Sequence, residues 1–134
     1  MDTSQNTLTP EPAVASSSEP LRYGAALTQA MEMLAFDPRV LFLGQAVGYP
    51  GTSMSGTVGK VPLPRRIEMP VAEEMQMGIS LGLSIAGFIP VTFYPRFNFL
   101  LLAMNQLVNH VDKLAAISHG AWPGRDIIRV GVGS

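Results

Sequence analysis

Cysteine is missing from this 134-residue chain. Without a thiol, the chain can form neither a disulfide framework nor a thiolate metal site, and it has no cysteine nucleophile. The composition fits a reducing compartment, and we expect a cytoplasmic protein. The function classes that remain are those that rely on carboxylate, amide, histidine or backbone chemistry.

Charge and long apolar runs are also scarce. Charged residues make up 14% of the chain and the formal net charge is −1, so no basic stripe is present and nucleic acid is not an expected partner. The most apolar stretch, residues 78–94, is short for a membrane span and is interrupted by Gly82, Gly87 and Pro90. It predicts a buried helix that turns into a buried strand, and no membrane partner.

The first twenty residues have no basic region and no apolar run, so they predict a disordered tail and not a secretory signal. From residue 21 to 134 the sequence predicts one domain. Apolar residues at helical spacing predict a helix over 22–35, which Asp37 and Pro38 end. A continuous apolar strand follows over 40–43, and then a long loop over 48–64.

The rest of the chain alternates strands and helices. The predicted elements are strands at 65–69, 89–93 and 127–132, with helices at 72–86 and 97–117. This alternation predicts an α/β fold: an open, mostly parallel sheet of about four strands with helices on both faces. Ligands bind such sheets beyond the carboxyl ends of the strands, so segments 44–49, 70–74 and 94–99 should converge on one rim.

Glu73 and Glu74 stand at the predicted start of a helix, directly after a strand. A carboxylate there often caps the helix or interacts with its dipole, and position alone favours this explanation. A buried carboxyl group at the rim could instead hold or pass a proton. His110 and His119 lack ligand-spaced partners, so they predict structural or interfacial roles and no metal site.

Three linked segments resemble a known family. They are VLFLGQAVGYPG, RIEMPVAEEMQMGISLGLSIAGFIPV and FNFLLLAMNQLVNHVDKL. In this order they resemble the transketolase-type pyrimidine-binding domain at the start of the β subunit of pyruvate and branched-chain 2-oxo acid dehydrogenases, over about residues 21–134. The resemblance implies a truncated thiamine diphosphate-binding fold and an enzyme component.

By that resemblance, Glu73 matches the glutamate that hydrogen-bonds a ring nitrogen of the thiamine aminopyrimidine and keeps a proton there. Phe99 and Phe97 match aromatic residues around that ring, although ordinary core packing is the alternative, which we favour for Phe97. Val71 matches a pocket-lining position. Gln45 stands where these β subunits often carry a glutamate. Glu74 matches no catalytic position and is expected to be solvated or interfacial.

The family binds the cofactor diphosphate through magnesium, at a Gly-Asp-Gly motif that this chain lacks. The resemblance therefore implies an α-type partner subunit that provides most of the protein contacts to the magnesium ion, and thus a cofactor site shared between subunits. It also implies a homodimeric contact between β-type chains. It implies a 2-oxo acid or sugar substrate. The family domain continues beyond residue 134, so we expect a fragment, a split gene product or an early-terminated subunit that is inactive alone.

Two alternatives stay open. The chain could be a non-catalytic remnant or interaction module that keeps the fold, with the apolar residues of 100–108 forming a contact surface. A nucleotide-binding sheet is less favoured, because no Gly-x-Gly-x-x-Gly motif follows the first strand.

Overall fold

The computed structural model describes residues 22–132 and contains an open four-stranded sheet. The strands are β1 (Val40–Gly44), β2 (Arg66–Glu68), β3 (Ile89–Tyr94) and β4 (Ile127–Val130). They lie in the order β2-β1-β3-β4, and every neighbouring pair is parallel. The predicted α/β class and the four-strand parallel sheet are therefore confirmed. The predicted disordered tail, residues 1–20, lies outside the described residues.

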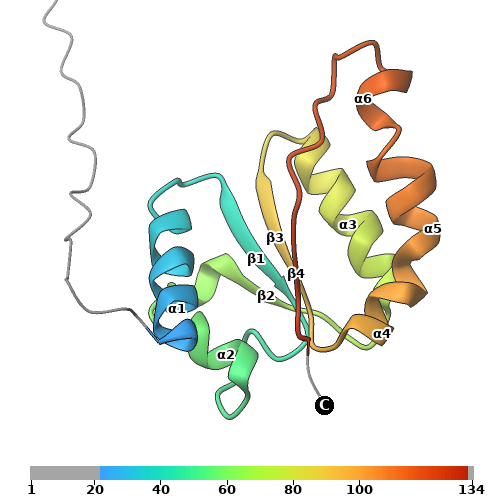
Figure 1. Ribbon diagram of the computed structural model, residues 1–134. Coiled ribbons are helices and arrows are strands. Elements are labelled where there is room, and N and C mark those ends of the chain that lie inside the picture. The colour runs from blue at the N-terminus through green and yellow to red at the C-terminus, as the bar shows by residue number, and fades with distance from the viewer. Residues whose placement is uncertain (1–21, 133–134) are drawn as a thin grey trace, which may run out of the picture.

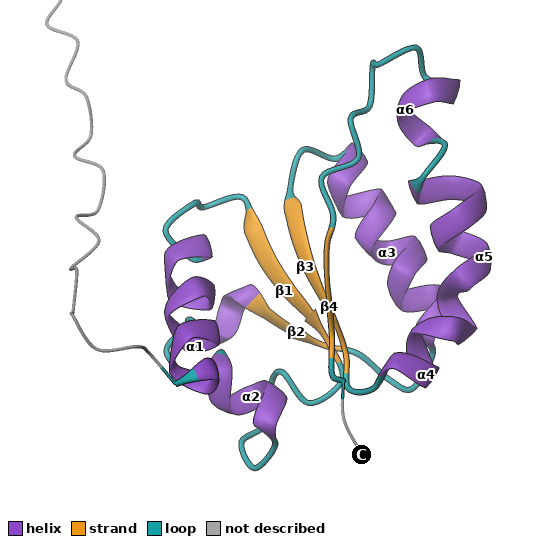
Figure 2. Ribbon diagram, viewed as in Figure 1, coloured by secondary structure: helices purple, strands orange, loops and turns teal. Residues whose placement is uncertain are grey.

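Helices cover both faces of the sheet (Figures 1 and 2). Helix α1 (Tyr23–Leu34) and the short helix α2 (Ser53–Thr57) lie on one side of it. The other side carries α3 (Glu73–Ile85), α4 (Phe97–Leu100), α5 (Met104–Gln106) and α6 (Leu114–Ile117). None of the helices in residues 22–132 is long and apolar enough to cross a membrane.

Each face of the sheet has its own core, because successive strand side chains point to opposite faces. Phe42 and Phe93 pack with Met31 of α1 and Met54 of α2 on one face. The second cluster, on the other face, contains Met77, Tyr94, Leu100 and Ala103, with Ile128 and Val130 of β4 packed against it. Burial on both faces explains why β1 and β3 read as continuous apolar runs.

The segment expected to be a loop over 48–64 contains α2 and a 3-10 turn, Leu63–Arg65. That expectation was wrong in part. The Thr52 side chain accepts a hydrogen bond from the Ser55 backbone N–H, and the Ser55 side chain accepts one from the Thr52 N–H. This reciprocal capping nucleates a helix too short to show apolar periodicity.

The single helix expected over 97–117 is also interrupted. Between α4 and α6 the backbone passes through a 3-10 turn, Leu101–Ala103, and a π-helical segment, Leu107–Val111. The Asp112 N–H donates to the Leu107 carbonyl, five residues back. Leu107 and Val111 still pack against the second cluster. Apolar spacing is preserved, so the sequence pattern gives no sign of the altered hydrogen bonding.

Parallel pairing brings the carboxyl ends of the strands to one edge. Gly44, the last residue of β1, pairs with Glu68 at the end of β2 and with Phe93 near the end of β3. A Cβ at Gly44 would stand 2.5 Å from the Phe93 carbonyl oxygen, so the close approach of β1 and β3 requires glycine. The residues that follow these strands form the site described next.

Candidate functional site

Glu73 is the first residue of α3 and is buried, with 6% of its surface exposed. Ala72 occupies the cap position, and no side chain caps this end of the helix. Placement in the first turn is confirmed, but capping does not explain the residue. A buried carboxyl group at the carboxyl rim of a parallel sheet lies where such sheets bind ligands, so Glu73 is a candidate site residue.

Gln45 supplies the polar contact to this carboxylate. Its side-chain Nε2 donates a hydrogen bond of 3.3 Å to Glu73 Oε1. Gln45 directly follows β1, and Glu73 begins the helix after β2. The predicted convergence of these two segments at one rim is therefore confirmed, and an uncharged amide donor faces the buried acid.

Two further side chains fix the start of α3 against β3. The buried Gln76 side chain donates to Thr92 Oγ1 at 2.8 Å and to the Phe93 carbonyl at 2.9 Å. The Tyr94 hydroxyl donates to the Glu73 carbonyl at 3.3 Å. Burial raises the pKa of Tyr94 to about 12, so the phenol keeps the proton that it donates. The backbone that carries Glu73 is thus held by the sheet.

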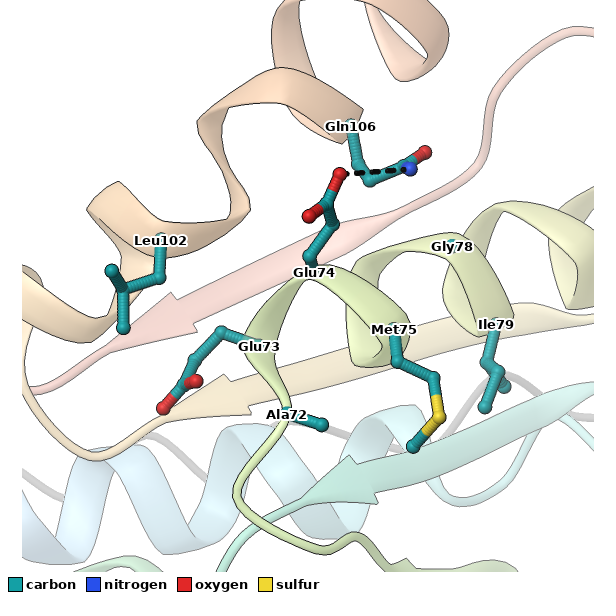
Figure 3. Close-up of a pocket in the computed structure, with 8 residues that line it drawn as sticks. All are labelled: Ala72, Glu73, Glu74, Met75, Gly78, Ile79, Leu102 and Gln106. Carbon is teal, nitrogen blue, oxygen red and sulfur yellow. Dashed lines mark hydrogen bonds between the residues drawn. The ribbon is translucent and has the colours of Figure 1, made fainter.

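Glu73 lies at the edge of a cavity of about 830 Å³. The side chains around it come from the first turns of α3 and from the helical segments opposite (Figure 3). The lining residues are Ala72, Glu73, Glu74, Met75, Gly78, Ile79, Leu102 and Gln106. Most of the wall is apolar, with two carboxyl groups and one amide among the side chains. This combination suits a largely apolar ring that carries a few polar atoms.

Glu73 and Glu74 leave the helix in different directions (Figure 3). Asn105 Nδ2 donates to Glu74 Oε1 at 2.9 Å, and Gln106 Nε2 donates to the same oxygen at 3.5 Å. Glu74 is exposed. Its carboxylate joins α3 to α5, which agrees with the expectation that Glu74 is solvated or interfacial.

The aromatic residues are placed less simply. Phe99 is partly buried and packs against the second cluster. Phe97 is 55% exposed, so the expectation of core packing for Phe97 was wrong: it begins α4 with its side chain outside both clusters. Val71 is 78% exposed. Neither Val71 nor Phe97 lines the cavity, and the roles of both toward a cofactor stay predictions.

The histidines stand apart from this site. His110 lies in the π-helical segment and His119 in the turn after α6, and both are exposed. Across residues 22–132, no three histidine or acidic side chains lie close enough together to hold a metal ion.

Sequence reasoning missed Gln76 and Tyr94. Tyr94 ends an apolar run and reads as a core residue. Gln76 had one usable signal, because it lies one helical turn after Glu73 and so faces the same sheet. A polar residue at an otherwise buried helix position needs partners, and here they are Thr92 and the Phe93 carbonyl.

No protein-family model matches the chain, but individual known proteins do. The pyruvate dehydrogenase E1 component subunit beta of Staurastrum punctulatum is 35% identical over 100 residues, which is 72% of this chain and 30% of that subunit. That of Chaetosphaeridium globosum is 34% identical over 108 residues, 78% of this chain and 33% of the subunit. The chloroplastic subunit beta-4 of Oryza sativa subsp. japonica is 32% identical over 126 residues, 88% of this chain and 32% of its own.

The chain therefore spans about a third of the length of the curated relatives that it matches. The similarity extends over most of the chain, and the fold is the one that the resemblance implied. Over most of its length, this chain is similar to one portion of the pyruvate dehydrogenase E1 β subunits.

Proposed function

We propose that this chain is the β-type component of a thiamine diphosphate-dependent 2-oxo acid dehydrogenase or a related transketolase-like enzyme. Glu73 would position a proton on the aminopyrimidine ring, and an α-type partner would bind the diphosphate and magnesium. One observation carries the proposal: a buried carboxyl group stands at the carboxyl rim of the sheet, beside an apolar cavity. The names of the relatives support the enzyme class.

The residues present fit the ring half of the cofactor. Ala72, Met75, Ile79 and Leu102 supply apolar surface for a flat ring, and Glu73 supplies a carboxyl group at its edge. When bound, thiamine diphosphate supplies the electron sink for breaking a carbon–carbon bond next to a carbonyl. The chain's own residues bind the ring, orient it and exclude water from its edge.

Glu73 has the central task in this proposal. Its carboxyl group would hold a proton at the ring nitrogen, and its burial would keep water from competing for that hydrogen bond. Gln45 would orient the carboxyl group through its 3.3 Å contact. Tyr94 and Gln76 would keep the helix start in place. Phe99, Phe97 and Val71 do not line the cavity, so they would contact the ring only if binding to a partner subunit extends the site to them.

Exposed apolar residues at the cavity mouth support a partner subunit. Met75 and Leu102, which both line the cavity, are 47% and 61% exposed. A surface that is both apolar and open is typical of a contact with another chain. We propose that the α-type subunit covers this mouth and brings the magnesium site. Leu101, Met104 and Val108 would serve a homodimeric contact between β-type chains. The cytoplasmic location stays a prediction.

Calorimetric titration tests the shared site. Thiamine diphosphate and magnesium are added to the chain alone, to a candidate α-type partner alone and to the mixture. We expect strong binding heat only from the mixture. Tight binding by this chain alone would contradict the shared-site proposal, and so would binding by the partner that this chain does not change.

A non-catalytic interaction module is the second candidate. The exposure of Val71 and Phe97, which the family resemblance matches to cofactor positions, favours it. The two candidates differ in what they require of Glu73: an interaction module needs only its fold, whereas the enzyme needs its proton.

A further inference from the structure

Glu68 is the last residue of β2, and its side chain binds the loop that follows β1. Glu68 Oε1 accepts a hydrogen bond of 2.7 Å from the Ala46 backbone N–H. Glu68 Oε2 accepts bonds from the N–H groups of Val47 and Gly48, at 2.9 and 2.7 Å. Three consecutive backbone donors therefore converge on one carboxylate. Hydrogen bonds to a charged acceptor are among the stronger ones in proteins.

The loop has the backbone shape of an anion-binding concavity. Ala46 has a φ of +58°, in the left-handed region that residues other than glycine rarely adopt. A left-handed residue within such a loop turns successive N–H groups toward one side, where they bind an anion. The chain's own Glu68 occupies that position here.

The surroundings fit this carboxylate closely. A Cβ at Gly48 would stand 3.1 Å from Glu68 Oε2 and 3.2 Å from the Glu68 Cβ, so the loop approaches that side chain because residue 48 is glycine. Arg66, also in β2, donates from its guanidinium to the Val47 carbonyl at 3.3 Å. Two side chains of β2 thus bind the same loop: Glu68 accepts from its backbone N–H groups, and Arg66 donates to one of its carbonyls.

Gln45 directly precedes residues 46–48, whose backbone N–H groups bind Glu68. The conformation at Ala46 sets the direction in which the chain leaves Gln45, and the Gln45 side chain reaches Glu73 Oε1. We propose that Glu68 is a positioning residue of the Glu73 site: by holding residues 46–48 it keeps the Gln45 amide against the Glu73 carboxyl group. The consequence for catalysis rests on the proposed function, whereas the positioning itself does not.

The first test follows the Gln45 side-chain amide by nuclear magnetic resonance in the ¹⁵N-labelled full chain. A Gln45→Met variant identifies the pair of signals by their loss. A Glu73→Ala variant shows where they move when the contact is absent. In Glu68→Gln, which keeps the shape but replaces one acceptor by a donor, we expect the Gln45 signals to move to the Glu73→Ala positions. We also expect the Val47 and Gly48 amides to exchange with solvent about tenfold faster.

The Gly48→Ala variant is an independent second route, because it leaves Glu68 intact and displaces its carboxylate. It should move the same Gln45 signals. If these signals stay at the parent positions in Glu68→Gln while the loop amides exchange faster, Glu68 stabilises the loop without positioning the Gln45 amide. That result would show that the proposal is wrong. If Glu68→Gln does not fold, unmoved Gln45 signals in Gly48→Ala overturn it.

Turnover by the assembled enzyme distinguishes a failure of this positioning proposal from a failure of the proposed enzymatic function. With an α-type partner, we expect Glu68→Gln to lower turnover about tenfold, because misplacing a catalytic group by a fraction of an ångström slows the reaction. A parent enzyme that shows no turnover contradicts the proposed function and leaves the resonance result standing. Parent-level turnover in a Glu68→Gln enzyme whose Gln45 signals have moved contradicts the catalytic consequence of the positioning.

Discussion

Gln45 Nε2 lies 3.3 Å from Glu73 Oε1, although 28 positions separate the two residues in the sequence. The contact joins the end of β1 to the start of α3 and puts an amide, not a second carboxylate, against the buried acid. Two carboxylates at this distance would repel each other when ionised. An amide can instead donate a hydrogen bond to the Glu73 carboxyl group, so this contact is attractive.

The close approach of β1 and β3 at Gly44 predicts a large loss of stability in Gly44→Ala. The new Cβ would meet the Phe93 carbonyl oxygen at 2.5 Å, and φ at Gly44 is +150°. We expect a loss of about 3 kcal/mol in the free energy of unfolding, measured by urea denaturation. Gly82→Ala is the matched control: its Cβ would meet nothing within 4 Å inside α3, so it should stabilise the chain by about 0.5–1 kcal/mol. Equal effects of the two substitutions would contradict the packing described at β1.

Arg65 holds the connection between α1 and β1. Its guanidinium donates to the carbonyls of Ala35, Asp37 and Val40, the last from Nε at 3.0 Å. Arg65→Met would leave these carbonyls without their charged donor, and we expect a loss of about 2–3 kcal/mol. Arg39→Met is the control, because Arg39 makes an exposed ion pair of 2.7 Å with nearby Asp37. Exposed pairs of that kind contribute little to stability because solvent screens them, so thermal unfolding should separate the two variants.

Asp126 predicts a dependence of stability on pH. Burial raises the pKa of Asp126 from 3.8 to about 6, and neither carboxyl oxygen has a hydrogen-bond partner among the described residues. The folded chain holds this proton more tightly than the unfolded chain. The contribution of Asp126 to stability is therefore full below pH 3.8, falls as pH rises through about 6, and is lost above it.

Removing the charge should remove this dependence. A shift of this size corresponds to about 3 kcal/mol, and partial exposure to solvent reduces the expected effect to about 1 kcal/mol. Urea denaturation at pH 4 and pH 8 gives the free energy of unfolding of Asp126→Asn and of the parent. The variant value minus the parent value should be more positive at pH 8 than at pH 4, by about 1 kcal/mol. A difference that is the same at both pH values would show that Asp126 titrates normally in the folded chain.

The sequence was sufficient for the sheet and its helices, because β1 and β3 are buried on both faces and α1 and α3 have clear apolar periodicity. It was insufficient where local hydrogen bonding decides the structure. Helix α2 depends on the reciprocal bonds of Thr52 and Ser55, and the π-helical segment shifts hydrogen bonding without changing the apolar spacing.

Within the site, the resemblance to the family pointed to Glu73 and Gln45, whereas position alone favoured a capping role for Glu73. The three N–H groups bound by Glu68 could not be predicted, because that contact depends on strand register and on the conformation of Ala46. The apolar pattern also failed to predict the exposure of Phe97. A large aromatic residue at the start of a helix predicts burial, and here it is exposed.

Turnover of a Glu73→Gln variant is the most direct measurement of the central proposal. The variant keeps the size of the side chain and removes the carboxyl group. It is assembled with the α-type partner at saturating thiamine diphosphate and magnesium and assayed for 2-oxo acid decarboxylation. Glu74→Gln is the matched comparison on the same helix turn, because the Glu74 carboxyl group accepts a hydrogen bond from Asn105 whereas that of Glu73 accepts one from Gln45.

Groups that transfer or hold a proton in catalysis typically contribute 10²–10⁴-fold. The proposal therefore predicts that Glu73→Gln lowers turnover at least about 100-fold, and that Glu74→Gln lowers it far less. Turnover of Glu73→Gln equal to that of the parent would contradict the proton-positioning role of Glu73.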